Sequence, residues 1–420
     1  MLKDKKSYPW MVVGMLVVVS LLNYLDRQML ATMRPFIMVD IKELESITNF
    51  GRLMAIFLWI YAIMSPISGM IADRLNRKWL IVISLFVWSF VTLMMGYTHD
   101  ISHLYILRAL MGISEAFYIP AALSLTADYH QGKTRSLAIG MLTSGIYLGQ
   151  AIGGFGATVA AHTSWQFTFH SFGLIGISYS LILILLLHEK KTYVIKTDQR
   201  KSMKENLSMA FKGLTVLFSN IAFWVMLYYF AALNLPGWTT KNWLPTMFSD
   251  SLNMEMEFAG PLSTTTLALS SFIGVFLGGF ISDKWVQKNI KGRIYTSVTG
   301  LSLIVPALLM MVNIIMIIAS AILFGLGFGI YDTNNMPILC QFIPSRYRAT
   351  GYGLMNFVGI AAGAIITNEL GKAFEANYKD LVFLIMIFSV CLSIFLQLKV
   401  LNPKTTDMTD ELMDKLNKKL

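Results

Sequence analysis

Long apolar stretches recur along the whole sequence, and they constrain the fold more than any other feature. Only 14% of the residues are charged, whereas a soluble domain carries about 25%. A helix that crosses a bilayer needs about 20 mostly apolar residues. The sequence therefore predicts an all-α membrane protein with twelve spans, at roughly 9–38, 51–73, 78–97, 102–128, 134–160, 168–188, 217–248, 259–281, 294–311, 313–343, 350–370 and 380–400.

The positive charges of the chain gather in alternate loops. The net charge is +10, but loops such as YTHDISH (97–103) and AAHTSW (160–165) contain no lysine or arginine. An excess of lysine and arginine marks the cytoplasmic loops of a membrane protein. We therefore expect both termini to lie in the cytoplasm, with the protein in the inner (plasma) membrane. On this interpretation the charge reflects topology, and no nucleic acid is expected as a partner.

A long hydrophilic stretch divides the chain into two halves that resemble each other. We expect one six-helix bundle over residues 1–188, a cytoplasmic linker over 189–213, a second bundle over 214–402 and a cytoplasmic tail over 403–420. GMIADR (69–74) matches GFISDK (279–284), and EAFYIP (115–120) matches DTNNMP (332–337) as acid, four residues, proline. Such pseudo-symmetric halves in transporters place the substrate between them at the membrane midplane.

The loop GMIADRLNRK (69–78) resembles the signature loop of the major facilitator superfamily. Asn76 stands where that family usually has glycine, and asparagine tolerates a left-handed backbone, so the turn can survive. SGIYLGQAIGG (144–154) is similar to the glycine-rich motif of the family's fifth helix, without its usual proline. The resemblance implies the major facilitator fold.

The signature loop suggests a set of gating residues. Asp73 can lie at a helix N-terminus, where the partial positive charge favours an anion, and Arg74 can pair with Asp128. We expect such contacts to latch one conformation, and direct contact with the substrate is the alternative. The complete set is Gly69, Asp73, Arg74, Asp128 and Asp283.

Ionisable residues also occur inside the predicted spans. A charge at the bilayer centre costs on the order of 3 kcal/mol, so these side chains should face a shared wet chamber between the halves. Arginine suits recognition of a carboxylate or phosphate, and a buried carboxylate can load and unload a proton. The alternative is a set of ion pairs that only hold helices together. The five residues are Asp26, Arg27, Arg108, Glu115 and Asp332.

NYLDR (23–27), the Arg-x6-Glu pattern at 108–115 and WLPTMF (243–248) resemble the anion:cation symporter family, which includes sugar-acid permeases and sialic acid and vesicular glutamate carriers. The resemblance implies proton coupling at Asp26 and Glu115 and anion binding at Arg27 and Arg108. Asp332 is predicted to join the proton-coupling residues from its place in the repeat. Tyr61 and Asn356 are further substrate-binding predictions, each with a helix–helix hydrogen bond as the alternative. The remaining substrate-binding predictions are polar residues expected to line the cavity near the membrane midplane, namely Gln150, Asn334 and Asn335.

The seventh predicted span contains GWTTKNW (237–243) beside a proline–glycine pair at 236–237. A helix broken at this pair would let its halves rearrange near a site, with Trp238 and Lys241 beside the break. We expect Trp243 to be an interfacial anchor.

Several function classes find no support in the sequence. HQGKT (130–134) lacks the glycine and the preceding strand of a phosphate-binding loop. No catalytic or metal-binding pattern is found, so we expect no enzyme activity, cofactor or metal. The sequence predicts a monomeric, proton-coupled symporter of an organic anion, such as a hexuronate or an aldonate. NYLDR and GISEAFY (112–118) also resemble the spinster family, so a lipid or lysolipid carrier is an alternative; a neutral sugar transporter and a receptor without transport are others.

Overall fold

The computed structural model describes residues 7–72, 75–130, 134–189, 214–312 and 316–408. Twelve of its helical segments are long and apolar enough to cross a membrane, as the hydropathy pattern predicts. No strand occurs among the described residues. The predicted linker at 189–213 lies outside the described ranges except for residue 189, and the predicted tail at 403–420 is described only as far as residue 408.

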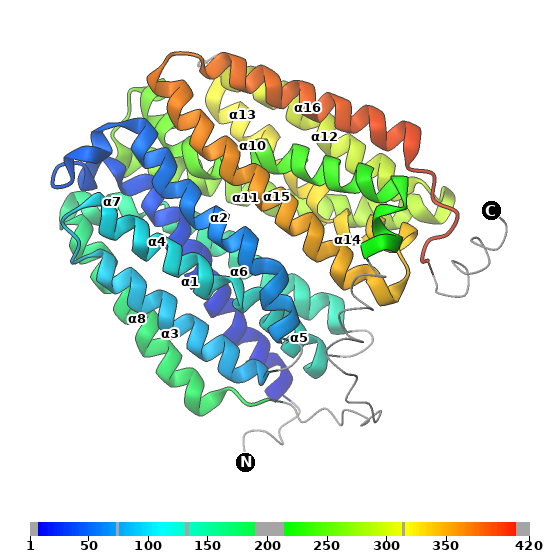
Figure 1. The fold of residues 1–420 in the computed structure, drawn as a ribbon, viewed down its shortest axis with the longest axis horizontal. Helices are drawn as coiled ribbons and strands as arrows, with labels where there is room; N and C mark the ends of the chain where they lie inside the picture. Colours follow the sequence, from blue (N-terminus) through cyan, green and yellow to red (C-terminus); the bar gives the residue numbers. More distant parts are fainter. Residues whose placement is uncertain (1–6, 73–74, 131–133, 190–213, 313–315, 409–420) are drawn as a thin grey trace.

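The helices form two bundles of six spans each, which lie side by side (Figure 1). The first bundle consists of α1 (Tyr8–Ile37), α2 (Ile47–Ala72), α3 (Arg77–Met95), α4 (Ile101–Ala116) with α5 (Tyr118–Tyr129), α6 (Arg135–Gly153) with α7 (Gly156–His162), and α8 (Trp165–Leu186). The second consists of α10 (Ile221–Leu252), α11 (Met256–Lys288), α12 (Gly292–Val312), α13 (Ile317–Asp332) with α14 (Asn335–Phe342), α15 (Ser345–Glu375) and α16 (Lys379–Val400). A short 3-10 helix, η1 (Lys42–Glu45), links α1 to α2.

The repeated acid-to-proline motif coincides with a helix interruption in each bundle. The fourth span breaks at Phe117, between α4 and α5, and the tenth span breaks between Asp332 and Asn335. In both spans the proline then falls in the first turn of the next helix, where a missing N–H leaves no intrahelical hydrogen bond unmade. The two interruptions place Glu115 and Asp332 at equivalent points of the two bundles.

Three local expectations from the sequence are wrong. The seventh span is not broken, because α10 runs continuously through Pro236 and Pro245. Trp243 is not an interfacial anchor: it is fully buried, and its Nε1 donates to the Thr367 carbonyl at 3.3 Å. Asn76 is not left-handed, since its φ is −63°, and its side chain instead caps α3 by accepting from the backbone N–H of Trp79.

Glycines bring α6 against α1 at very short range. Added Cβ atoms at Gly145, Gly149 and Gly153 would lie 2.5, 2.1 and 2.8 Å from the carbonyl oxygens of Val17, Leu21 and Leu25. Both sets of residues recur every four positions, so one face of each helix carries the contact. The glycine-rich motif therefore acts in packing inside the first bundle.

The two bundles meet closely at one end of the molecule, which we call the closed end. It carries the loops at 38–46, 163–164, 253–255 and 376–378. Phe50 of α2 packs edge-on against Trp243 of α10, which also contacts Phe374 of α15. The carboxylate of Glu375 accepts hydrogen bonds from the hydroxyl of Ser46 and the backbone N–H of Thr48, each at 3.0 Å.

The opposite corner of the closed end joins α6 and α7 to the start of α11. A Cβ added at Gly154 would lie 2.8 Å from the carbonyl oxygen of Gly260, so the two backbones approach directly. The hydroxyl of Thr158 also donates to the Glu257 carbonyl at 2.7 Å. Small side chains and hydrogen bonds thus hold this end of the bundles together.

Candidate functional site

A cavity of about 310 Å³ lies between the two bundles and is lined by both. That volume is at the lower end of the range for small-molecule sites. The polar lining side chains of the first bundle include Tyr24, Arg27, Tyr61, Thr143, Tyr147 and Gln150, and those of the second include Asn234, Lys241, Tyr331, Asp332, Tyr352 and Asn356.

Arg27 of α1 is held rigidly in one wall of this cavity. Its Nε donates to Oε2 of Glu115 at 2.5 Å. Its guanidinium carbon lies 4.7–4.8 Å from the ring centres of Tyr24, Phe57 and Tyr61. Within the described part of the chain, neither terminal nitrogen of Arg27 donates a hydrogen bond. Arg27 therefore keeps N–H donors in the cavity wall that no described residue uses, although Nη2 is itself buried.

Three of the predicted ionisable residues lie behind this wall, in the interior of the first bundle. Glu115 is fully buried and contacts Arg27. Asp26 accepts a hydrogen bond from the hydroxyl of Thr92 at 3.2 Å. Arg108 stacks on Phe57, one of the rings that Arg27 also contacts, and its guanidinium carbon lies 4.6 Å from the centre of that ring. The five predicted charges therefore do not all face one chamber.

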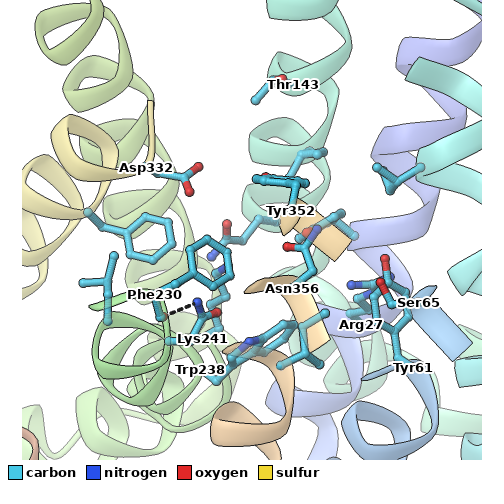
Figure 2. A pocket seen from close by; sticks show the side chains of 18 of the residues that line it. Arg27, Tyr61, Ser65, Thr143, Phe230, Trp238, Lys241, Asp332, Tyr352 and Asn356 are labelled. Atoms are coloured by element: carbon cyan, nitrogen blue, oxygen red, sulfur yellow. Dashed lines mark hydrogen bonds between the residues drawn. The ribbon is translucent and has the colours of Figure 1, made fainter. Parts of the chain in front are cut away.

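Asp332 lies across the cavity, at the end of α13. Its Oδ1 accepts a hydrogen bond from Nδ2 of Asn335 at 3.1 Å. Figure 2 shows Asp332, Phe230 and Lys241 on one side, opposite Arg27, Tyr61 and Ser65. Of the five predicted ionisable residues, Arg27 and Asp332 line the cavity.

The predicted polar contacts divide in the same way. Tyr61, Gln150 and Asn356 line the cavity, as a substrate-binding role requires. Asn334 and Asn335 are buried in the second bundle, and Asn334 donates to the Ile330 carbonyl at 2.9 Å. Their side-chain hydrogen bonds lie at the break between α13 and α14 and outside the cavity lining, so substrate binding by these two residues stays a prediction.

Lys241 is a lining residue that the list of interior charges omitted. It lies on α10, where the sequence drew attention to a broken helix and not to the charge itself. The signal was available, because an ionisable residue within a span needs an interior partner or a wet cavity. The aromatic hydroxyls of Tyr24, Tyr147 and Tyr352 were also missed, since tyrosines are common in apolar spans.

The predicted gating residues that the structure describes lie away from the cavity. Asp73 and Arg74 fall outside the described residues. Asp128 of α5 pairs with Arg77 of α3, with Nη1 and Oδ2 2.5 Å apart. A Cβ at Gly69 would meet no atom within 4 Å, and Asp283 is exposed on α11. The contacts expected of Asp73 and Arg74 stay predictions.

Among the described residues, no group of three or more histidine, cysteine, aspartate or glutamate side chains could hold a metal ion.

Comparison with known proteins places the chain among transporters. A family model described as Major Facilitator Superfamily matches residues 16–367. The hexuronate transporter of Bacillus subtilis (strain 168) is 27% identical over 67% of this chain and 66% of its own length. The probable galactarate/D-glucarate transporter GudP of the same organism is 27% identical over 89% of this chain and 87% of its own.

A solved structure has a closely similar fold. It is the crystal structure of a bacterial homologue of the human lysosomal transporter Spinster, in an inward-facing and unoccupied conformation. The two chains superpose with a TM-score of 0.73 and 19% sequence identity, covering 97% of this chain and 100% of the other. This likeness concerns the fold.

Proposed function

Because the chain belongs to the Major Facilitator Superfamily and is a multi-pass membrane transporter, we propose that it imports a sugar-acid anion together with protons. The observation that carries the proposal is Arg27, a cavity-lining guanidinium fixed by Glu115, whose terminal nitrogens donate no hydrogen bond to any described residue. Arginine binds a carboxylate through two parallel hydrogen bonds. The sugar-acid relatives in Bacillus subtilis support the same substrate class.

The rest of the cavity suits the remainder of such a substrate. Tyr61, Gln150 and Asn356 offer hydroxyl and amide groups to the sugar hydroxyls, and Trp238 and Phe328 offer apolar faces. A few polar groups that fix orientation within an apolar lining are typical of small-molecule sites. A lipid chain would leave these polar groups without hydrogen bonds, which is unfavourable.

The contact between Glu115 and Arg27 supplies a route to proton coupling. A neighbouring guanidinium favours the charged form of a carboxyl group. A substrate carboxylate that engages Arg27 weakens this effect, so anion binding and proton uptake by Glu115 are linked. Asp26, in the same buried region of the first bundle, is the second acid that this coupling would involve. Asp332, on the opposite cavity wall, is the third.

The side from which the cavity is reached follows from the topology that the charge pattern predicts. With both termini in the cytoplasm, the closed end faces outward and the cavity is reached from the cytoplasmic side. Alternating access then requires the contacts around Phe50, Trp243 and Glu375 to part while the other end closes. Such a cycle needs one copy of the chain, in the inner membrane.

Uptake by liposomes containing the purified protein tests the proposal. We expect a sugar acid to drive proton uptake and to accumulate when a proton gradient is imposed. Arg27→Gln should weaken binding by about 100-fold or more, since each hydrogen bond to a charged group contributes about 1.5–3 kcal/mol. Arg52→Gln, on an exposed arginine of α2 outside the cavity, is the matched control.

Glu115→Gln separates coupling from binding. The variant should still exchange bound substrate across the membrane but should not concentrate it. If Glu115→Gln concentrates the substrate against its gradient, the coupling role is wrong. If Arg27→Gln binds sugar acids as well as Arg52→Gln does, the anion site is wrong. Binding of lysolipids or neutral sugars in preference to acids would favour the alternative carriers.

A further inference from the structure

Lys241 places a second positive charge in the cavity, on the bundle opposite Arg27. Its ammonium nitrogen lies 5.0 Å from the ring centres of Trp238 and Phe328. Across the described residues, no hydrogen-bond acceptor or ion-pair partner contacts this nitrogen. An ammonium group inside a protein is expected to have a charged or hydrogen-bonding partner. Two aromatic faces supply only part of that stabilisation.

The nearest candidate within the protein is Asp332, which does not satisfy Lys241. Asp332 acts on Lys241 electrostatically from the same side of the cavity, yet the two form no ion pair within 4.0 Å. The carboxylate of Asp332 is instead bound by Asn335. The cavity thus keeps an ammonium group and a carboxylate apart, with space between them.

The position of Lys241 is fixed relative to Arg27. Nε2 of Gln28, the residue after Arg27, donates to the backbone carbonyl of Lys241 at 2.9 Å. This hydrogen bond joins α1 to α10 and therefore the two bundles. Figure 2 shows the two side chains on facing sides of the same space. A ligand in that space meets one cation from each bundle.

We propose that Lys241 is a second anion-recognition residue and that the substrate is a sugar acid with a carboxylate at each end. One carboxylate binds Arg27 of α1 and the other binds Lys241 of α10, so the substrate bridges the two bundles. This inference rests on the proposed function and narrows its substrate class from sugar acids in general to sugar diacids. Asp332 is the residue with which the second carboxylate competes for Lys241.

Galactarate and galactonate make a matched pair of probes, because they share one carbon skeleton and differ in a terminal carboxylate or hydroxymethyl group. Binding of each to the detergent-purified chain is measured by calorimetry. We expect the wild-type protein to bind galactarate about tenfold or more tightly than galactonate, the effect of one hydrogen-bonded charge. Lys241→Gln should remove this preference by weakening galactarate binding, with galactonate binding changed less than threefold.

Two further variants keep the test decisive. Lys241→Arg should retain the preference for the diacid, and it reports on the charge even if Lys241→Gln folds poorly. Asp332→Asn should strengthen galactarate binding, because it removes the competing carboxylate. An unchanged or weakened affinity in Asp332→Asn would contradict the competition.

The outcomes separate this inference from the function on which it rests. If the wild-type protein binds both acids equally, or if Lys241→Gln weakens both to the same extent, the role of Lys241 is overturned while sugar-acid transport stands. If the wild-type protein binds neither acid, the proposed function itself fails.

Discussion

Replacement of Gly149 by alanine tests how closely α1 and α6 must approach. The added Cβ would lie 2.1 Å from the carbonyl oxygen of Leu21, where ordinary contacts begin at 3.4 Å. One helix must therefore move by about 1.3 Å, the difference between the two, and the obstructing atom belongs to the backbone, which cannot rotate away. Overpacking of this kind costs about 1–3 kcal/mol, occasionally more.

Gly140, on the same helix, supplies the control. A Cβ at Gly140 meets no atom within 4 Å, so alanine there should only gain helix propensity, about 0.5–1 kcal/mol. Gly149→Ala gains the same propensity, so the two variants should differ in their free energy of unfolding by the overpacking cost alone, about 1–3 kcal/mol. Titration of the purified protein in mixed micelles with sodium dodecyl sulfate measures this difference. Equal stability of the two variants would refute the packing argument.

Two other predictions concern the ends of the bundles. Glu375→Gln should weaken the closed end, so that amide hydrogen exchange in residues 46–52 becomes a few-fold faster. The control is Glu369→Gln, whose partner Lys372 lies on the same helix, and it should leave this exchange unchanged. Equal exchange rates in the two variants would argue against the Glu375 contact. Asp100 accepts the backbone N–H of His103, which lowers the pKa of Asp100. Its contribution to stability is therefore present above the ordinary aspartate pKa of about 3.9 and is lost as the pH falls through the lowered value. The difference in free energy of unfolding between the wild-type protein and Asp100→Ala should thus become smaller below about pH 4. If this difference is the same at pH 7 and pH 3, the proposed contribution of Asp100 is wrong.

The number and order of the spans could be predicted from the sequence because hydrophobic length is a local property. The repeat was likewise visible, and its acid-to-proline motif coincides with the interruptions at Phe117 and between Asp332 and Asn335. Whether a proline breaks a helix was not predictable in the same way. Pro236 lies in a continuous helix, since neighbouring helices can compensate for one missing hydrogen bond in a membrane.

Which charged side chains pair between helices could not be predicted from the sequence. The spacing of Arg108 and Glu115 showed that both face inward, and both are buried. It could not show that Glu115 binds Arg27 while Arg108 stacks on Phe57, because these contacts depend on how far each helix is rotated and shifted against the next. The prediction that all the charges share one chamber treated inward-facing and cavity-lining as the same thing. The structure separates them.

That separation bears on how the transporter would work. Arg27 reaches the cavity while its partner Glu115 stays behind the wall, so a ligand touches the cation and reaches the acid only through it. Lys241 and Asp332 differ, since both groups face the cavity directly. Protonation of Glu115 would therefore alter anion affinity without direct contact with the substrate, whereas Asp332 would compete with the substrate for a cation. The two acids, equivalent by the repeat, would thus affect transport in different ways: Glu115→Gln should alter coupling, and Asp332→Asn should alter affinity for the anion in addition to coupling.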